Sequence, residues 1–284
     1  MTGTFDIHAT VTQHILDALE TADVSNWQCP WHRTRGGLPR NALTGKSYRG
    51  INTVSLWVAN QVHGYGDPRW ATYRQWQELG AQVRKGEKSS LVVFYKDFQV
   101  DPSEEGDDGR RMVARASYAF NAAQVDGAEP LDTIPAGGFD PIQHAEDFSI
   151  SSGIRIEHGG EAACYIPAQD LVRMPSRDRF VGADGYYGTL FHELVHATGH
   201  ESRLNRDLTG RFKTRQYAAE ELVAELGAAF LMAELGLEAS EPHPQHAIYI
   251  KSWISLLQDD SRAVFTAASL ASKAVDYLKG AGAP

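Results

Sequence analysis

Apolar side chains recur at helical spacing at the beginning of the chain. Between residues 6 and 22 they share one face of a helix: Ile7, Val11, Ile15, Leu16 and Leu19. The segment 29–52 that follows (CPWHRTRGGLPRNALTGKSYRGIN) contains Pro and Gly too often for a regular element, so a loop is expected there. A second helix is expected at 53–61.

A β-hairpin is expected in the next part of the chain. The segment 72–79 predicts a brief helix that Gly80 ends. The run 89–100 (SSLVVFYKDFQV) is rich in β-branched and aromatic residues, which favours a strand, and 111–120 is its expected partner. The tip between them (DPSEEGDDGR) is acidic and polar, which indicates a solvated loop.

The second half of the chain has a mainly helical pattern. Periodicity is weak from 122 to 138, and we expect a linker at 126–140. The elements expected beyond it are a helix at 141–151, strands at 154–158 and 163–167, and helical stretches at 187–199, 216–235 and 246–278. The pattern therefore predicts an α+β protein of two domains, a small α+β domain at 1–125 and a mainly helical domain at 141–284.

Composition narrows the class of protein. The 284 residues are 42% hydrophobic, with no uninterrupted apolar run near the roughly 20 residues of a membrane helix. The first residues lack the basic and apolar parts of a signal peptide, so we expect a cytoplasmic protein that does not enter a membrane. The two cysteines, Cys29 and Cys164, are far apart, which predicts neither a disulfide framework nor a zinc finger. Any metal site must then use His and carboxylates.

Charge is distributed unevenly along the chain. The formal net charge is −9, yet residues 27–96 hold eleven Lys and Arg against three acids, a net charge of +8. Aromatic residues are interleaved with these cations, a combination typical of single-strand binding, because phosphates attract positive charge and unpaired bases stack on rings. The candidate DNA-binding residues are Trp31, Arg33, Lys46, Tyr48, Arg49, Arg69, Trp70, Arg74, Arg84, Lys85 and Lys88.

Some of the aromatic residues in this segment must form a core instead. Trp57 and Trp76 lie in apolar helical segments, and we assign them to the core. Trp31, Tyr48 and Trp70 stand beside Pro, Gly and Arg, which predicts exposed positions in loops.

The clearest chemical motif is GTLFHELVHATGH. Its His192 and His196 are four residues apart, so on a helix both imidazoles project from one face and can bind a single Zn²⁺. Glu193 is placed to take a proton from a water molecule whose pKa the metal has lowered, which predicts a catalytic base. Apolar neighbours on both sides indicate a partly buried helix rather than a solvated one.

A catalytic zinc usually has a third protein ligand. The metzincin pattern fails because Ser202 stands where it requires His. The next helix, QYAAEELVAELGAAFL, carries three carboxylates: we expect Glu221 as the ligand, Glu225 as the acid that orients a ligand histidine, and Glu220 as a solvated surface residue. Glu225, Glu220 and His200 remain alternative third ligands.

Residues upstream of the motif could line a substrate cleft. The segment 166–175 is expected to form an edge strand and loop, along which an extended peptide could bind by strand addition. Tyr186 and Tyr187 could stabilise an oxyanion, although packing in the core is the expected role of such a pair.

Motifs along most of the chain resemble the ArdC-type antirestriction proteins of conjugative plasmids and phages. The resemblance rests on NALTGKSYRGIN, DPRWATYRQWQELGAQVRKGEKSSLVVFY, HELVHATGHESRLNR and YAAEELVAELGAAFL. It implies an N-terminal domain that binds single-stranded DNA and a C-terminal zincin-type, SprT-like metallopeptidase domain. It also implies protection of incoming mobile DNA, with an unidentified protein substrate or restriction enzyme as partner.

Two functions from different classes follow. The first is a DNA-associated zinc metallopeptidase in which Glu193 activates water. The alternative is a non-catalytic DNA-binding or restriction-decoy protein with a structural metal, but such a site needs no base beside its ligands. A nuclease is disfavoured because nuclease sites prefer paired Mg²⁺ ions and carboxylate clusters.

Overall fold

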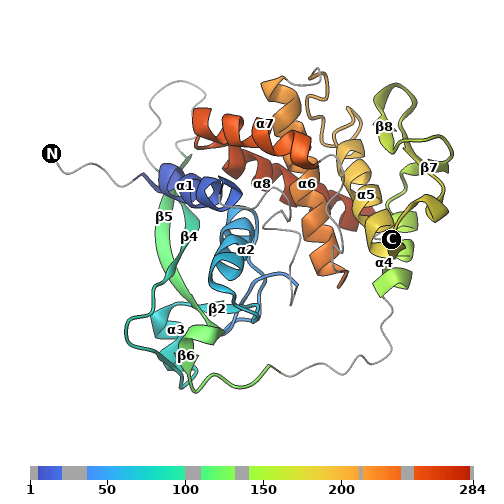
Figure 1. Ribbon diagram of the computed structural model, residues 1–284. Coiled ribbons are helices and arrows are strands. Elements are labelled where there is room, and N and C mark those ends of the chain that lie inside the picture. The colour runs from blue at the N-terminus through green and yellow to red at the C-terminus, as the bar shows by residue number, and fades with distance from the viewer. Residues whose placement is uncertain are drawn as a thin grey trace.

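The computed structural model describes residues 6–20, 37–99, 110–131, 141–210, 214–237 and 246–281, and Figure 1 shows their arrangement. The fold is α+β, as the pattern predicted. The helices and strands of the first part are α1 (Ile7–Glu20), β1 (Arg40–Asn41), α2 (Ile51–His63), β2 (Arg69–Ala71), α3 (Tyr73–Glu78), β3 (Gln82–Val83), β4 (Ser90–Gln99), β5 (Arg110–Asn121) and β6 (Val125–Asp126).

Both early helices form where hydrophobic spacing predicted them. On α1 the residues at that spacing, from Val11 to Leu19, are buried. Helix α2 is capped by Gly64, whose φ of 68° is a left-handed conformation that glycine adopts without strain. On α3, Thr72 and Gln75 form a capping box, in which each side chain bonds the backbone of the other.

A four-stranded sheet holds the first part together, in the order β1-β2-β5-β4. Strands β4 and β5 pair antiparallel from Ser90 opposite Ala119 to Gln99 opposite Arg110. The hairpin predicted from β-branched residues is therefore present. Its tip at 101–109 lies outside the described residues, as do Trp31, Arg33 and the segment 132–140.

The burial of two aromatic residues contradicts the sequence prediction. Trp70 is fully buried and Tyr48 is 9% exposed, although both were expected in exposed loops. Trp70 belongs to β2, which lies between β1 and β5, and its ring packs with Leu56 and Val92. The neighbouring Pro and Arg suggested a loop, but pairing with distant strands determines the burial. The prediction of Trp57 and Trp76 in the core is confirmed, since each is 2% exposed.

The second part consists of helices around a small sheet. Its elements are α4 (Pro141–Ser151), β7 (Arg155–His158), β8 (Cys164–Ile166), β9 (Leu171–Met174), α5 (Gly182–Ala197), α6 (Arg215–Glu234), α7 (His246–Asp259) and α8 (Ala263–Ala281). The strand order is β7-β9-β8, with β9 parallel to β7 and antiparallel to β8. The prediction of an edge strand at 166–175 is therefore wrong for β9, which pairs on both sides and is the central strand. Strand β8 is an edge of this sheet.

Helix α6 is the centre of the helical part, and it packs against α5, α7 and α8. Every residue from Leu222 to Ala233 is buried, because helices cover α6 on several sides. Within the described residues, no helix is long and apolar enough to cross a membrane.

The two parts of the chain share one hydrophobic core. Helix α1 packs on α7 and helix α2 on α8, as Figure 1 also shows. Polar contacts join the same surfaces: Thr12 Oγ1 donates to the carbonyl of Ser261 at 2.7 Å, and the amide of Gly50 donates to Ser272 Oγ at 3.2 Å. The apolar faces of α1 and α2 therefore depend on the C-terminal helices for their burial.

Candidate functional site

Two helices bring the motif residues and the acidic residues together. Helix α5 carries His192 and His196 one turn apart, and α6 carries the carboxylates that face them. The helices approach closely at Gly227, where an added Cβ would lie only 2.7 Å from Val195 Cγ2. A glycine at this crossing allows the two sets of side chains to meet.

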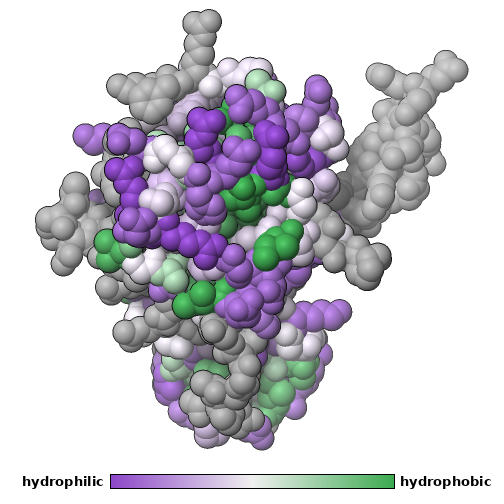
Figure 2. All heavy atoms as spheres, turned by 90° about the vertical axis from the view of Figure 1, so that its right-hand side faces the viewer, coloured by the Kyte–Doolittle hydropathy of each residue, from purple (hydrophilic) through white to green (hydrophobic). Residues whose placement is uncertain are grey.

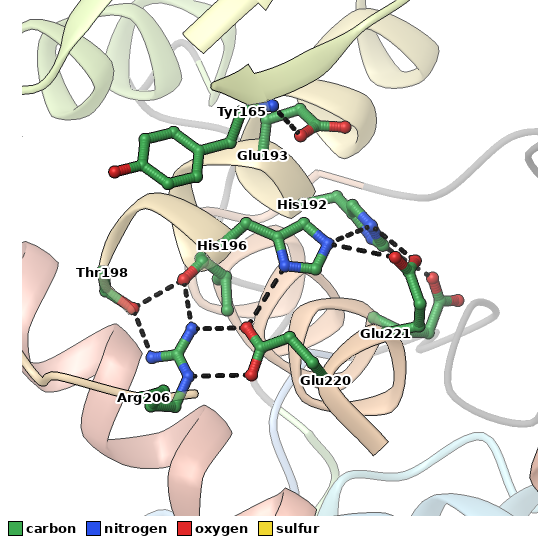
Figure 3. Close-up of polar contacts among 10 residues, drawn as sticks. Tyr165, His192, Glu193, His196, Thr198, Arg206, Glu220 and Glu221 are labelled. Carbon is green, nitrogen blue, oxygen red and sulfur yellow. Dashed lines mark hydrogen bonds and ion pairs between the residues drawn. The ribbon is translucent and has the colours of Figure 1, made fainter. Parts of the chain in front are cut away.

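His192, His196 and Glu221 form a compact triangle of donor atoms (Figure 3). The two Nε2 atoms are 3.1 Å apart, Glu221 Oε2 is 3.4 Å from His192 Nε2, and Glu221 Oε1 is 3.6 Å from His196 Nε2. In a tetrahedral zinc site with bonds of about 2.0–2.1 Å, neighbouring donor atoms are roughly 3.3–3.4 Å apart. The three residues therefore fit one divalent cation.

Glu220 contacts the His196 ring on the side away from the donor triangle, contrary to the sequence prediction. Its Oε1 is 3.2 Å from His196 Nδ1, and its side chain is only 13% exposed. Arg206 donates to both carboxylate oxygens of Glu220, at 2.8 and 3.1 Å. Glu220 is therefore not a solvated surface residue. The loop before α6, which contains Arg206, covers it, and the helical pattern of α6 gives no sign of that loop.

Arg206 is a site residue that sequence reasoning missed. Its side chain is 6% exposed, and it also donates to the carbonyl of Val195 at 2.7 Å and to Thr198 Oγ1 at 2.8 Å (Figure 3). One guanidinium thus ties the end of α5 to Glu220 on α6. No spacing rule indicates this contact, since Arg206 lies in an irregular segment.

The remaining candidate ligands differ in position. Glu225 Oε2 is 3.7 Å from His192 Nδ1, which places it behind that histidine as an ion-pair partner. His200 lies outside the donor triangle, and its Nδ1 is 2.8 Å from Ser202 Oγ. Helix α5 ends at Ala197, so the ring of His200 does not continue the helical face of the two ligands.

Glu193 lies beside the triangle and contacts an edge strand. It is 9% exposed, and its Oε2 accepts a hydrogen bond of 2.7 Å from the backbone amide of Tyr165 on β8 (Figure 3). The pKa of the neighbouring Cys164 thiol is raised by burial and by the charge of Glu193. Strand β8 therefore runs directly past the carboxylate that the motif assigns as the base.

The tyrosine pair before the motif packs in the core. Tyr186 and Tyr187 are 4% and 2% exposed, and Tyr187 Oη donates to Glu146 at 2.6 Å. The hydroxyl of Tyr186 lies 2.8 Å from His158 Nε2. The packing role that the sequence favoured is the one that the structure has.

The stability of the metal-free protein should depend strongly on pH, because two histidines of the site have raised pKa values. Burial lowers the pKa of His196, but hydrogen bonds to Glu220 and Glu221 outweigh burial and raise it to about 9; the pKa of His192 is also raised. A raised pKa stabilises the fold fully below the ordinary value of 6.5, and this contribution is lost as pH rises through about 9. We expect the free energy of unfolding of chelator-treated protein to fall between these pH values.

The same protons compete with the metal. Because the imidazoles must be neutral to bind, apparent zinc affinity should rise over the same pH range, and metal-bound protein should lose the pH dependence of its unfolding. Thermal unfolding with and without chelator measures both effects. Metal-free stability that increases from pH 6.5 to pH 9 would contradict this prediction.

Two known families match the chain. One, described as the N-terminal domain of anti-restriction factor ArdC, matches residues 5–125, and a zincin-like metallopeptidase family matches residues 143–270. The metal-free crystal structure of the antirestriction protein ArdC from plasmid R388 has 37% sequence identity and a TM-score of 0.80, with 98% of each chain covered. The chain belongs to the ArdC family of antirestriction proteins.

Other proteins are similar to this ArdC-family chain over most of its length. The Mn(II)-bound structure of R388 ArdC has 38% identity and a TM-score of 0.78, with 98% of this chain and 99% of that chain covered. Protein y4eC of Sinorhizobium fredii is 44% identical, with 96% of this chain and 91% of that protein covered. Two Escherichia coli DNA primases TraC are 38% and 37% identical over 95% of this chain, which spans only 20% and 27% of their lengths.

The predicted DNA-binding residues of this ArdC-family chain separate into two groups. Several are engaged within the protein: Arg69 forms a bidentate pair with Asp67, Arg49 pairs with Asp276, and Tyr48 and Trp70 are buried. Four other cations are exposed: Lys46, Arg74, Lys85 and Lys88. Arg84 is exposed as well, but it is engaged within the protein, because it pairs with Glu87 at 2.9 Å and with Asp126 at 3.6 Å. The exposed group, rather than the buried aromatic residues, is available to a ligand.

An open groove of about 540 Å³ lies beside two of the exposed cations. Its lining includes Tyr73, Lys85 and Phe120, together with Arg84 and the two carboxylates that pair with it, Glu87 and Asp126. Tyr73 is 44% exposed, and sequence reasoning passed over it although it adjoins Arg74. Phe120 could not have been identified, because only the pairing of β5 with β2 brings it to the groove.

Proposed function

We propose that this ArdC-family protein is a zinc-dependent peptidase that also binds single-stranded DNA, and that it protects incoming mobile DNA from restriction. The observation that carries the peptidase function is the triangle of His192, His196 and Glu221 with Glu193 beside it. Three protein ligands leave a coordination position for a reactant, whereas structural zinc sites are closed by four. This favours chemistry over a purely structural metal.

The side chains of the chain supply the proton transfers. A cation in the triangle would lower the pKa of a water molecule towards neutrality and polarise a peptide carbonyl. Glu193 accepts the proton of the attacking water at its carboxylate and passes it to the departing amine nitrogen. The amide of Tyr165 restricts the orientation of Glu193, because it donates to one carboxylate oxygen.

An extended peptide has a suitable place to bind. Strand β8 is an edge of its sheet and passes Glu193, and an edge strand offers backbone groups to an added strand. On the side of the molecule that carries β7, β8 and α4, Figure 2 shows a hollow with hydrophobic residues inside and hydrophilic residues around it. Such a surface suits an apolar side chain of a protein substrate.

The groove at Tyr73 is our proposed single-strand site. A phosphate would lie near Lys85, and an unpaired base would stack on the exposed ring of Tyr73. We expect Tyr73→Ala to weaken binding of labelled oligothymidylate by about 1–3 kcal/mol at every salt concentration. Lys85→Ala should instead reduce the slope of log affinity against log salt by about 0.7, the value for one phosphate contact.

Fluorescence anisotropy of the full-length protein measures both effects. The full chain is needed because α1 and α2 share their core with the C-terminal helices. Tyr118→Ala is the matched control, since Tyr118 is also exposed but does not line the groove. If Tyr118→Ala weakened binding and Tyr73→Ala did not, the strand would bind on the β4–β5 hairpin and the groove assignment would be wrong.

A further inference from the structure

An ion pair beside strand β8 has no role in the function proposed above. Asp170 follows the short helical turn Pro167–Gln169 that connects β8 to β9, and its φ of 47° is a left-handed conformation. Arg203, from the motif HELVHATGHESRLNR, donates to both carboxylate oxygens of Asp170: Nη1 to Oδ1 at 2.9 Å and Nη2 to Oδ2 at 2.7 Å. Glycine adopts this φ without strain, and aspartate only at a cost. The strained backbone of Asp170 therefore indicates that its carboxylate has a task.

Arg203 ties this connection to the end of helix α5. Its Nη1 also donates to the carbonyl of Ala197, the last residue of α5, at 2.9 Å. Carbonyls in the last turn of a helix lack helical partners and accept hydrogen bonds from arginine side chains. The side chain of Arg203 is only 11% exposed, which shields its pair with Asp170 from water. The connection between β8 and β9 is thus held at a defined place on α5.

Tyr165 attaches β8 to α5 at a second place. Its hydroxyl donates to Asp170 Oδ1 at 2.9 Å, and its backbone amide donates to Glu193 at 2.7 Å (Figure 3). Glu193 precedes Ala197 by one turn of α5, about 6 Å along the helix axis. Two attachments one turn apart fix both the position and the direction of β8 along the helix. The hydrogen bond to Glu193 alone would leave the strand free to rotate.

We propose that Asp170 and Arg203 are positioning residues that hold β8 where the Tyr165 amide meets the Glu193 carboxylate. The proposal rests on the peptidase function proposed above, in which Glu193 is the base. Strand β8 needs a support of this kind because it is an edge strand that pairs only with β9. Neither Asp170 nor Arg203 belongs to the donor triangle, so metal binding should not depend on them.

The loop after α5 then has two separate tasks. Arg206, from the same motif, donates to Glu220, which contacts His196 of the donor triangle. Arg203 instead supports β8 through Asp170, which accepts a hydrogen bond from that strand. Loss of Arg206 should therefore weaken zinc binding, whereas loss of Arg203 should slow hydrolysis and leave zinc affinity unchanged.

The first test is hydrogen exchange of the Tyr165 amide in the full-length protein, measured by mass spectrometry at residue resolution without peptide or DNA. We expect about 10–100-fold faster exchange in Arg203→Ala, because the amide is then no longer held against its acceptor. Asp170→Gly should have the same effect, since glycine keeps the left-handed turn without strain and only the carboxylate is lost. Glu193→Ala marks the largest effect, because it removes the acceptor itself.

A matched control removes an ion pair of the same kind elsewhere. Arg177 Nη2 donates to both carboxylate oxygens of Glu146 at 2.8 Å, shortly before the first residue of α5. Arg177→Ala should leave the exchange of the Tyr165 amide unchanged. Faster exchange of this amide in the control would attribute the effect to general destabilisation and overturn the proposal.

The second test compares hydrolysis of labelled casein with zinc affinity. Arg203→Ala should lower kcat by up to about 100-fold, since a small misplacement of the base is enough for a loss of that size. Its zinc affinity, measured by competition with a chromophoric chelator, should equal that of the parent protein. Arg203→Lys should recover little of the rate, because lysine cannot form the two-pronged contact with a carboxylate.

Other outcomes would overturn the proposal. Unchanged exchange of the Tyr165 amide in both Arg203→Ala and Asp170→Gly would do so, and so would exchange that accelerates equally in α6, because the role would then be structural. A zinc affinity that falls as far in Arg203→Ala as in Arg206→Ala would also overturn it. A parent protein that cleaves no casein would count against the peptidase function alone, because exchange of the Tyr165 amide is measured without substrate.

Discussion

Glu193→Gln is expected to lower peptide hydrolysis by about 10²–10⁴-fold, the usual contribution of a positioned general base. An amide of the same shape cannot accept the proton of the attacking water, but its oxygen can still accept the hydrogen bond from Tyr165. Glu193 is not part of the donor triangle, so the bound metal should remain. Labelled casein, with and without single-stranded DNA, is the substrate for the assay, and metal analysis of the purified protein accompanies it.

Glu157→Gln is the matched control, because Glu157 is an exposed carboxylate on β7. It should retain both metal and hydrolysis. Hydrolysis that is unchanged in Glu193→Gln would exclude Glu193 as the base. A parent protein that binds metal but cleaves nothing would favour the alternative of a non-catalytic, DNA-binding decoy.

Arg206→Ala should destabilise the protein by about 3–5 kcal/mol, as expected when one partner of a buried ion pair is removed. Without the guanidinium, Glu220 keeps a charge in a site where its side chain is 13% exposed, and the carbonyl of Val195 loses a donor. Zinc affinity should also fall by about 10–100-fold, because Glu220 no longer holds His196 firmly. Urea unfolding of chelator-treated protein separates the stability effect from the metal effect.

Removal of both partners provides the control for Arg206. The double variant Arg206→Ala with Glu220→Ala leaves no unpaired charge, so it should be more stable than Arg206→Ala alone. Equal destabilisation of the single and double variants would mean that the ion pair is not the cause. If Arg206→Ala left the zinc affinity unchanged, Glu220 would not be needed to hold His196 in place.

Local periodicity was sufficient to predict most helices and the three donor residues that the structure brings together. The helices α1, α2, α4 and α6 lie within two residues of the expected ranges, because burial of one face imposes a spacing that the chain itself displays. The same geometry brings His192 and His196 together, since residues four apart on a helix are neighbours whatever surrounds them. Glu221 could be proposed because α6 is a long apolar helix interrupted by few carboxylates.

Contacts between distant segments decided which side chains are buried and which partners they have. Glu220 is an ordinary helix carboxylate until Arg206, from a loop, covers it. Trp70 has the neighbours of a loop residue, yet β1 and β5 enclose it. Phe120 reaches the groove only through strand pairing, and Tyr217 meets Tyr249 only because α7 packs on α6. The sequence by itself therefore determined which side chains share one face of a helix or strand. Only tertiary packing decided which of them are buried, which hydrogen bonds support the donor triangle and where the groove lies, because these depend on partners from distant segments that no local spacing encodes.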